Sequence, residues 1–174
     1  MKTITFIGRI HPQKGLIYLL IAWKKIRKAY PDFSLQIIGG YDNDYGNKLM
    51  AKSNNPQVKW LGFVSDRKQI AEYLMNSYCI VLPSLFEGSP LTLFEGLASK
   101  RPVICSDLPA IKSICSEEEA IFFKAGDADD LASKMSWAID NPDKAKVIGS
   151  EGRQVAERYN WDEIAKRTVE VYLK

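Results

Sequence analysis

Short apolar runs alternate with longer amphipathic segments along most of this 174-residue chain. The short runs are rich in β-branched and aromatic residues, which favour strands. They lie at Thr3–Ile7, Phe33–Ile38, Val58–Leu61, Cys79–Leu82, Val103–Cys105 and Ala120–Phe123. Strands that alternate with helices through short connections predict an α/β fold, a three-layer Rossmann-like parallel sheet with helices on both faces.

Apolar residues at helical spacing, together with local start and stop signals, place the helices. The first helix carries an apolar stripe from Leu16 to Ile26, and we expect it to end near Tyr30-Pro31 because proline disfavours helix in the residue before it. Further helices are expected to start at Asp66 and at Trp161. Another should have Ser89 as N-cap and Pro90 as its first residue, and should run to Ser99. A fourth should start at Asp127 or Asp129 and stop at Asn141-Pro142. We expect one domain over residues 1–174, ending in tail helices from about residue 128 to 174.

Composition excludes several classes of protein. Hydrophobic residues make up 46% and charged residues 26%, as in ordinary soluble globular proteins, and the net charge of +3 is too small to indicate a nucleic-acid partner. Three cysteines and one histidine without zinc-site spacing predict no structural metal. Cys79 and Cys105 lie in apolar runs and are interpreted as buried thiols, and the chain has no signal peptide or membrane-span-length run, so we expect a cytoplasmic protein.

Three loops follow predicted strands and therefore meet at the carboxyl edge of the sheet, where ligands bind in such folds. They are Gly8–Gly15, Gly62–Asp66 and Pro83–Pro90. In the first loop, Gly8 allows close backbone approach, and Arg9 and Lys14 can bind phosphate oxygens ahead of a helix start. On spacing alone, a surface turn with two solvated cations remains slightly favoured for this loop.

Two glutamates, Glu87 and Glu95, flank the third loop and the helix start after it. Backbone N–H groups of Leu91 and Thr92 at that start can hold a diphosphate, while the carboxylates can accept hydrogen bonds from sugar hydroxyls. Two solvated acids are an equally favoured interpretation. A glycosidase, which also uses two carboxylates, is disfavoured because Arg9 would have no role and no aromatic sugar platforms are evident.

The remaining chemical candidates are weaker in isolation. Trp60–Ser65 can form a slot for a flat base or can be a strand end turning over the core. His11 is expected to be a loop residue rather than a base. Tryptophans are expected to pack in the core or between helices, at Trp23, Trp60, Trp137 and Trp161.

Together these segments resemble the donor-binding domain of the retaining glycosyltransferases of family 4, also called group 1, which have the GT-B fold. Gly8-Arg9 with Lys14-Gly15 is similar to the family's G-R…K-G phosphate motif, and Leu61–Val64 is similar to its base segment. The run from Pro83 to Ala98 is similar to its E-x7-E motif, with Glu87 and Glu95 as the two glutamates. The resemblance covers essentially the whole chain and implies that it is the C-terminal half of a GT-B fold.

The resemblance implies a role for each segment. Glu87 would contact the transferred sugar as the catalytic residue, with Gly88 beside it, and Glu95 would hold the ribose. The base would meet Gly62, Phe63 and Val64. The diphosphate contacts would be Gly8, Arg9, Lys14, Ser89, Pro90, Leu91 and Thr92. The donor would be a UDP-, GDP- or ADP-sugar. No metal or other cofactor is expected, because no acidic metal cluster is visible in the sequence.

The chain departs from the family pattern in two ways. Gly88-Ser89-Pro90 replaces the common Gly-Phe-Gly, and Pro90 has no N–H, so one backbone contact is lost. Gly96 and Lys100 replace the usual alanine and glycine. Both departures flank the expected site and bear on the identity of the sugar more than on the fold.

Enzymes of this family have two Rossmann-like domains, and the acceptor lies mostly on the N-terminal one. This chain begins at the first strand of the C-terminal domain, so we expect the N-terminal acceptor domain to be absent and the isolated chain to transfer nothing. The parent would be a hexosyltransferase of polysaccharide, lipopolysaccharide or glycolipid synthesis, attached to a membrane at most peripherally. The alternatives are a non-catalytic nucleotide-sugar binding module and a nucleotide-sugar 2-epimerase-like protein.

Overall fold

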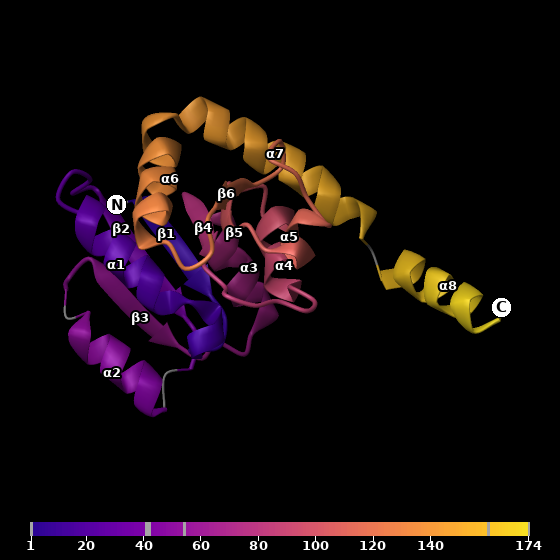
Figure 1. Ribbon diagram of the computed structural model, residues 1–174, viewed down its shortest axis with the longest axis horizontal. Helices are drawn as coiled ribbons and strands as arrows, with labels where there is room; N and C mark the ends of the chain where they lie inside the picture. The colour runs from indigo at the N-terminus through magenta and orange to yellow at the C-terminus, as the bar shows by residue number, and fades with distance from the viewer. Residues whose placement is uncertain (1, 41–42, 54, 160, 174) are drawn as a thin grey trace.

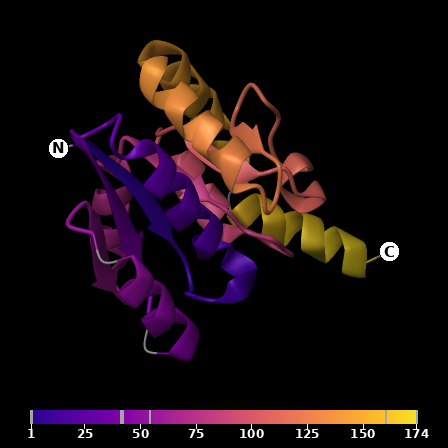
Figure 2. The same cartoon turned by 60° about the vertical axis from the view of Figure 1, so that its left-hand side comes forward.

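The computed structural model describes residues 2–40, 43–53, 55–159 and 161–173, which form one parallel sheet between layers of helices (Figures 1 and 2). The strands of this described part are β1 (Lys2–Ile7), β2 (Phe33–Ile38), β3 (Val58–Gly62), β4 (Cys79–Leu82), β5 (Val103–Ser106) and β6 (Ile121–Phe123). Their order is β3-β2-β1-β4-β5-β6, and every neighbouring pair is parallel. The predicted α/β class and the six predicted strands are confirmed, with each strand end within one residue of its expected position.

Helices cover both faces of this sheet. The helical elements are η1 (Pro12–Lys14), α1 (Leu16–Ile26), α2 (Asp44–Lys52), α3 (Arg67–Met75), α4 (Leu91–Ala98), α5 (Pro109–Lys112), α6 (Ala128–Asp140), α7 (Pro142–Arg158) and α8 (Trp161–Tyr172). One core cluster joins α1, α2 and α6 to the sheet, and the other joins α3, α4 and α5 to its opposite face. Helix α7 contributes Ala145 to the first cluster and Val155 to the second, so it passes from one face to the other, whereas α8 stands apart from the body (Figure 1).

Burial along the strands follows their place in the sheet. Every residue of β4 and β5 is buried, as expected for inner parallel strands covered on both faces, while the edge strand β3 alternates between half-buried and exposed. Trp23 is buried in the core, and Trp60 and Trp137 pack against it, which confirms their predicted packing role. The side chain of Trp161 lies outside the described residues.

The expected burial of the cysteine thiols is also confirmed. Cys79 and Cys105 are fully inaccessible, and Cys115 is buried as well. Burial raises the pKa of the Cys79 thiol to about 12, because the apolar strand environment disfavours the thiolate. Cys79 is therefore an inert packing residue at neutral pH.

One predicted helix end was wrong, and two helices were not predicted. Helix α1 ends at Ile26, before the expected Tyr30-Pro31, because the chain turns after it, with Ala29 N–H donating to Ile26 O at 2.9 Å. Helix α2 was not predicted: its apolar signal is weak, and Asn43 caps it by accepting from the N–H of Gly46 at 2.8 Å. The four-residue helix α5 was also missed, since it is too short to show a period.

Asp66 caps helix α3 as predicted, accepting a hydrogen bond from the N–H of Lys68 at 2.9 Å. We expect Asp66→Ala to lower the free energy of unfolding by about 1 kcal/mol, because one helix N–H loses its acceptor. Urea unfolding measures this change. Glu72→Ala, an exposed change on the same helix, serves as the control, and an equal loss in both variants would contradict the capping role.

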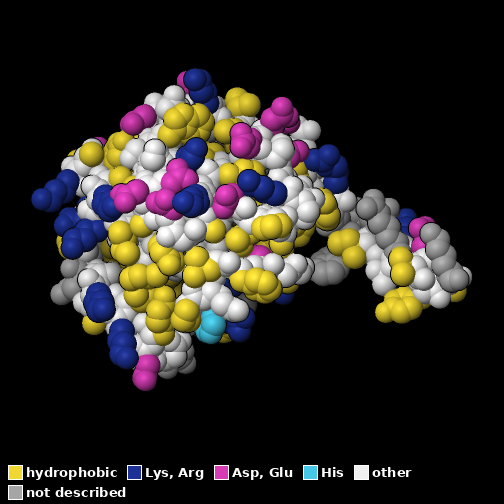
Figure 3. Space-filling model, viewed as in Figure 1, with side chains coloured by type: hydrophobic (Ala, Val, Ile, Leu, Met, Phe, Trp, Pro, Cys, Tyr) yellow, Lys and Arg dark blue, Asp and Glu magenta, His cyan; other side chains and the backbone are white. Residues whose placement is uncertain are grey.

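Charge on the face shown in Figure 3 is mixed, with basic and acidic side chains interspersed over α1 and α6. Lys25 and Asp129 form an ion pair between these two helices.

Among the described residues, no helix is long and apolar enough to cross a membrane.

Candidate functional site

A pocket of about 460 Å³ opens at the carboxyl edge of the sheet, where the strand order reverses between β1 and β4. All three loops singled out in the sequence contribute to it. Its lining residues are Ile7, Gly8, Arg9, Lys14, Ile38, Gly39, Gly40, Phe63, Val64, Ile70, Ser89, Leu91, Thr92 and Glu95. The structure therefore brings together most of the residues that the sequence placed in one site.

The loop after β1 is held by its own backbone and by the loop after β4. His11 begins the η1 turn by accepting a 3.3 Å hydrogen bond from the N–H of Gln13, so its predicted place in the loop is confirmed. Gly15 adopts φ +61°, and a Cβ there would lie 1.8 Å from Pro83 O. This close approach fixes the η1 turn directly against the loop that carries Glu87.

The two cations of this loop are arranged differently. Arg9 is exposed at the pocket and has no ion-pair partner among the described residues. Lys14 lines the pocket too, but its Nζ lies 2.7 Å from Glu87 Oε1. Arg9 is thus available to an anion, whereas Lys14 is shared with a carboxylate.

Glu87 is paired with Lys14 but is not among the residues that line the pocket. Its side chain is only 10% exposed, and it also accepts a 2.6 Å hydrogen bond from the hydroxyl of Ser84. Ser84 is a partner that sequence reasoning missed, although its place three residues before Glu87 and directly after a buried strand was a usable signal.

The start of helix α4 differs from the prediction. Pro90 is the N-cap residue, helix α4 begins at Leu91, and no side chain caps it. The predicted cap at Ser89 is therefore wrong: Pro90 has ψ 76°, outside the helical range, and the Leu91 N–H donates to the Ser89 carbonyl at 2.9 Å. This bond also removes the Leu91 N–H from the expected anion donors.

Other N–H groups at this helix start remain available. Within the described residues, the structure gives no hydrogen-bond partner to the backbone N–H of Gly88, Ser89 or Thr92. Thr92 lies in the first turn of α4, where the helix dipole favours negative charge. These free donors, together with Arg9 across the pocket, can bind a diphosphate.

Glu95 lies one turn further along α4, at the rim between this pocket and a second pocket that contains Arg67. Partial burial raises the pKa of the Glu95 carboxyl above its ordinary value, and the positive charge of Arg67 opposes that rise with a smaller effect. Glu95 lines the pocket, and its carboxylate can accept hydrogen bonds from hydroxyl groups.

A pH-dependent stability difference follows for Glu95. A folded-state pKa above the unfolded one means that its stabilising contribution is present below the unfolded pKa and is lost as the pH rises through the folded pKa. We expect Glu95→Gln to increase the free energy of unfolding at pH 7, with the gain shrinking toward about pH 4. Urea unfolding at both pH values measures this, with Glu72→Gln as the control, and a gain independent of pH would contradict it.

Part of the predicted base segment also lines this pocket. Phe63 is 79% exposed, and Phe63 and Val64 both line the pocket, whereas Gly62 does not. Gly62 instead adopts φ +73° and accepts the Gly39 N–H at 2.8 Å, so it turns the chain toward the pocket. An exposed aromatic ring at the rim is suited to stacking on a flat base.

Gly39 and Gly40 are pocket residues that sequence reasoning missed. A Cβ on Gly39 would lie 2.0 Å from Gly8 O, so the ends of β1 and β2 approach more closely there than a larger residue allows. The signal was a glycine pair directly after the apolar run Phe33–Ile38.

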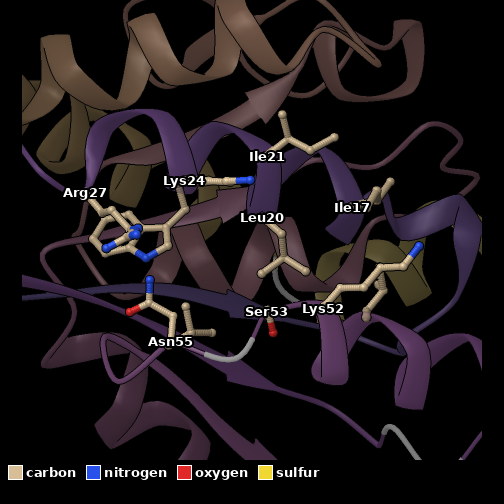
Figure 4. Close-up of a pocket in the computed structure, with 11 residues that line it drawn as sticks. Ile17, Leu20, Ile21, Lys24, Arg27, Lys52, Ser53 and Asn55 are labelled. Carbon is tan, nitrogen blue, oxygen red and sulfur yellow. The ribbon is translucent and has the colours of Figure 1, made fainter.

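Two further kinds of candidate site remain: a group of metal-ligating side chains and another pocket. In the part of the chain that the structure describes, no group of three or more His, Cys, Asp or Glu side chains could hold a metal ion. Another pocket, of about 300 Å³, lies between α1 and α2, where Leu20 and Ile21 meet the basic side chains of Lys24, Arg27 and Lys52 (Figure 4). It contains none of the predicted site residues.

The sequence matches the family described as glycosyl transferases group 1 over residues 1–155. An uncharacterized glycosyltransferase from Haemophilus influenzae is 28% identical over 167 residues, which cover 94% of this chain and 46% of that protein. Phosphatidyl-myo-inositol mannosyltransferase from Mycobacterium leprae is 28% identical over 177 residues, which cover 98% and 46%. The chain thus spans about half the length of these relatives.

Solved structures agree with the family match. Sucrose-phosphate synthase from Thermosynechococcus elongatus superposes with a TM-score of 0.86 at 25% identity, covering 98% of this chain and 44% of that one. HepE from Anabaena, solved with UDP-glucose, superposes with a TM-score of 0.85 at 19% identity, covering 98% and 48%, which shows the shared fold. With the family match extending over most of its length, this chain belongs to the group 1 glycosyl transferases.

Proposed function

We propose that this chain is the donor-binding, C-terminal half of a retaining GT-B glycosyltransferase of family 4, and that its carboxyl-edge pocket binds a nucleotide-sugar. The observation that carries the proposal is the convergence of Arg9, the free N–H of Thr92 and Glu95 on one pocket of about 460 Å³. Few ligands match a cation, a helix N-terminus and a carboxylate at once. A sugar nucleotide does, because it joins a diphosphate to hydroxyl-rich rings.

The diphosphate is proposed to lie between Arg9 and the start of α4. Arg9 can donate a planar pair of hydrogen bonds to phosphate oxygens, and the N–H groups of Gly88, Ser89 and Thr92 can donate from the other side. These groups stabilise negative charge as it develops on the leaving diphosphate during transfer. No metal is required in this scheme.

In this proposal the ribose, the transferred sugar and the base lie on either side of the diphosphate. Glu95 lies about 6 Å along the helix axis from Leu91 at 1.5 Å per residue, a distance suited to the ribose next to the diphosphate. Glu87, beside Lys14, contacts the transferred sugar. Phe63 and Val64 contact the base, whose identity as uracil, guanine or adenine is open to experiment.

The acceptor is proposed to bind a second, N-terminal domain, because the relatives are about twice as long as this chain. The isolated chain would then bind donor without transferring sugar. Synthesis of a glycolipid by the parent is supported by the similarity to the mycobacterial phosphatidyl-myo-inositol mannosyltransferase. We further propose that the parent acts in the cytoplasm with at most peripheral membrane attachment, in polysaccharide, lipopolysaccharide or glycolipid synthesis. A binding module or a 2-epimerase is not favoured, since the chain belongs to a transferase family.

Calorimetry with UDP, GDP and ADP tests the proposal. We expect the 174-residue chain to bind at least one of these diphosphates. We also expect it to transfer no sugar from the matching nucleotide-sugar to an acceptor. A folded sample that binds none of the three would contradict the proposed function.

A further inference from the structure

The carboxylate of Glu87 receives two hydrogen-bond donors on the same oxygen atom. Lys14 Nζ lies 2.7 Å from Oε1, and Ser84 Oγ lies 2.6 Å from the same atom. Among the described residues, Oε2 has no partner. One oxygen is therefore anchored by the protein, while the other keeps its capacity to accept a hydrogen bond.

The two donors belong to loops that are fastened together. The Leu85 N–H donates to Gln13 O at 2.7 Å, and Gly15 lies against Pro83 O. Ser84 is 2% exposed, so water has almost no access to compete for its hydroxyl. Ser84 and Glu87 consequently keep their relation to the η1 turn that carries Lys14.

Lys14 and Glu87 carry opposite charges at the margin of the diphosphate site. A phosphate that reaches Lys14 must share its ammonium group with Glu87, and the carboxylate itself repels the phosphate. Lys14 has three donor hydrogens and can serve both acceptors, but only Ser84 holds Glu87 independently of the phosphate. A sugar hydroxyl donating to Oε2 would offset the repulsion.

We propose that Ser84 is a positioning residue that presents Glu87 to the transferred sugar, and that Glu87 and Lys14 together make the site prefer the nucleotide-sugar over the free nucleoside diphosphate. This rests on the proposed function. In the empty site Lys14 neutralises Glu87. With donor bound, Lys14 turns partly to the phosphate and Ser84 keeps the carboxylate in place. After transfer, no sugar hydroxyl donates a hydrogen bond to Glu87. The negative charge of Glu87 then repels the diphosphate and favours its release.

The test compares affinities for UDP and UDP-glucose by calorimetry on the whole 174-residue chain, or for the matching guanosine or adenosine pair if the diphosphate panel selects that base. Ser84→Ala should lower the ratio of nucleotide-sugar affinity to diphosphate affinity by about tenfold, the scale of one charged hydrogen bond. Glu87→Gln should bind the diphosphate about fivefold more tightly, because one repulsive charge is removed.

Ser77→Ala is the matched control. Ser77 is also 2% exposed and hydrogen-bonded, to Thr5 and to Tyr73 O, but it precedes β4 at the opposite edge of the sheet. Its loss removes a buried hydroxyl without touching Glu87, so the affinity ratio should stay at the wild-type value. A ratio lowered equally by both serine variants would overturn the positioning role.

The outcomes separate the two proposals. If the wild-type chain binds no diphosphate, the proposed function fails and this inference fails with it. If it binds but Ser84→Ala keeps the wild-type ratio, or Glu87→Gln weakens diphosphate binding, only this inference is overturned. A double-mutant cycle measured by urea unfolding gives a check without ligand. Ser84→Ala should lower the free energy of unfolding more when it is introduced into the wild-type protein than when it is introduced into the Glu87→Leu variant. Equal losses in the two backgrounds would refute the contact between Ser84 and Glu87.

Discussion

Replacing Arg9 with glutamate is expected to weaken binding of the nucleoside diphosphate about 100-fold or more. Arg9 lines the pocket and is free of ion pairs within the described residues. A charge-assisted hydrogen bond contributes roughly 1.5–3 kcal/mol, and about 1.4 kcal/mol corresponds to a tenfold change in affinity. The introduced carboxylate adds repulsion to that loss.

Calorimetry of wild-type and variant chains with the diphosphate measures this effect. Arg27→Glu is the matched control, because Arg27 follows the far end of α1, away from the carboxyl edge, and lines the other pocket (Figure 4). The affinity of the Arg27→Glu variant for the diphosphate should remain near that of the wild-type chain. Unchanged affinity in the Arg9 variant, or an equal loss in both variants, would refute direct phosphate contact.

Gly15→Ala is expected to lower the free energy of unfolding by roughly 2–5 kcal/mol and to abolish donor binding. The left-handed conformation at φ +61° adds roughly 1–2 kcal/mol for a residue with a Cβ. Overpacking adds about 1–3 kcal/mol more, since the new Cβ would meet Pro83 O at 1.8 Å and force the two loops apart.

Urea unfolding of the variant measures the loss. Gly88→Ala is the control for stability, because no atom lies within 4 Å of the position its Cβ would occupy and its φ is not positive. We expect a change of less than about 0.5 kcal/mol there. Similar losses at both glycines would contradict the tight junction at Gly15.

The sequence was sufficient for the sheet because its strands carry strong signals. β4 and β5 are buried along their whole length and therefore read as unbroken apolar runs. Helix α2 escaped prediction because it contains few apolar residues and Gly46 lies within it. Its start is set by the Asn43 cap, a contact that only the folded backbone displays.

The residues of the candidate site were assigned from the resemblance to family motifs, but their mutual contacts were not predicted. The sequence placed Lys14 and Glu87 in separate loops and the resemblance gave them separate roles, whereas the fold joins them in one ion pair. The close approach of Gly15 to Pro83 brings this about, and sequence alone cannot show a long-range backbone contact. Ser89 shows the converse: its residue type favours capping, yet the Pro90 backbone, at φ −80° and ψ 76°, lies outside the helical range, so the helix begins only at Leu91.

The most direct test of the central claim is a crystal structure of this chain with the nucleotide-sugar selected by the diphosphate panel. We predict the diphosphate at the start of α4, with phosphate oxygens about 2.7–3.2 Å from the Thr92 N–H nitrogen and from the Arg9 guanidinium. The ribose should lie beside Glu95, and the sugar beside Glu87. A nucleotide bound between α1 and α2, or with its phosphates away from both Thr92 and Arg9, would contradict the account.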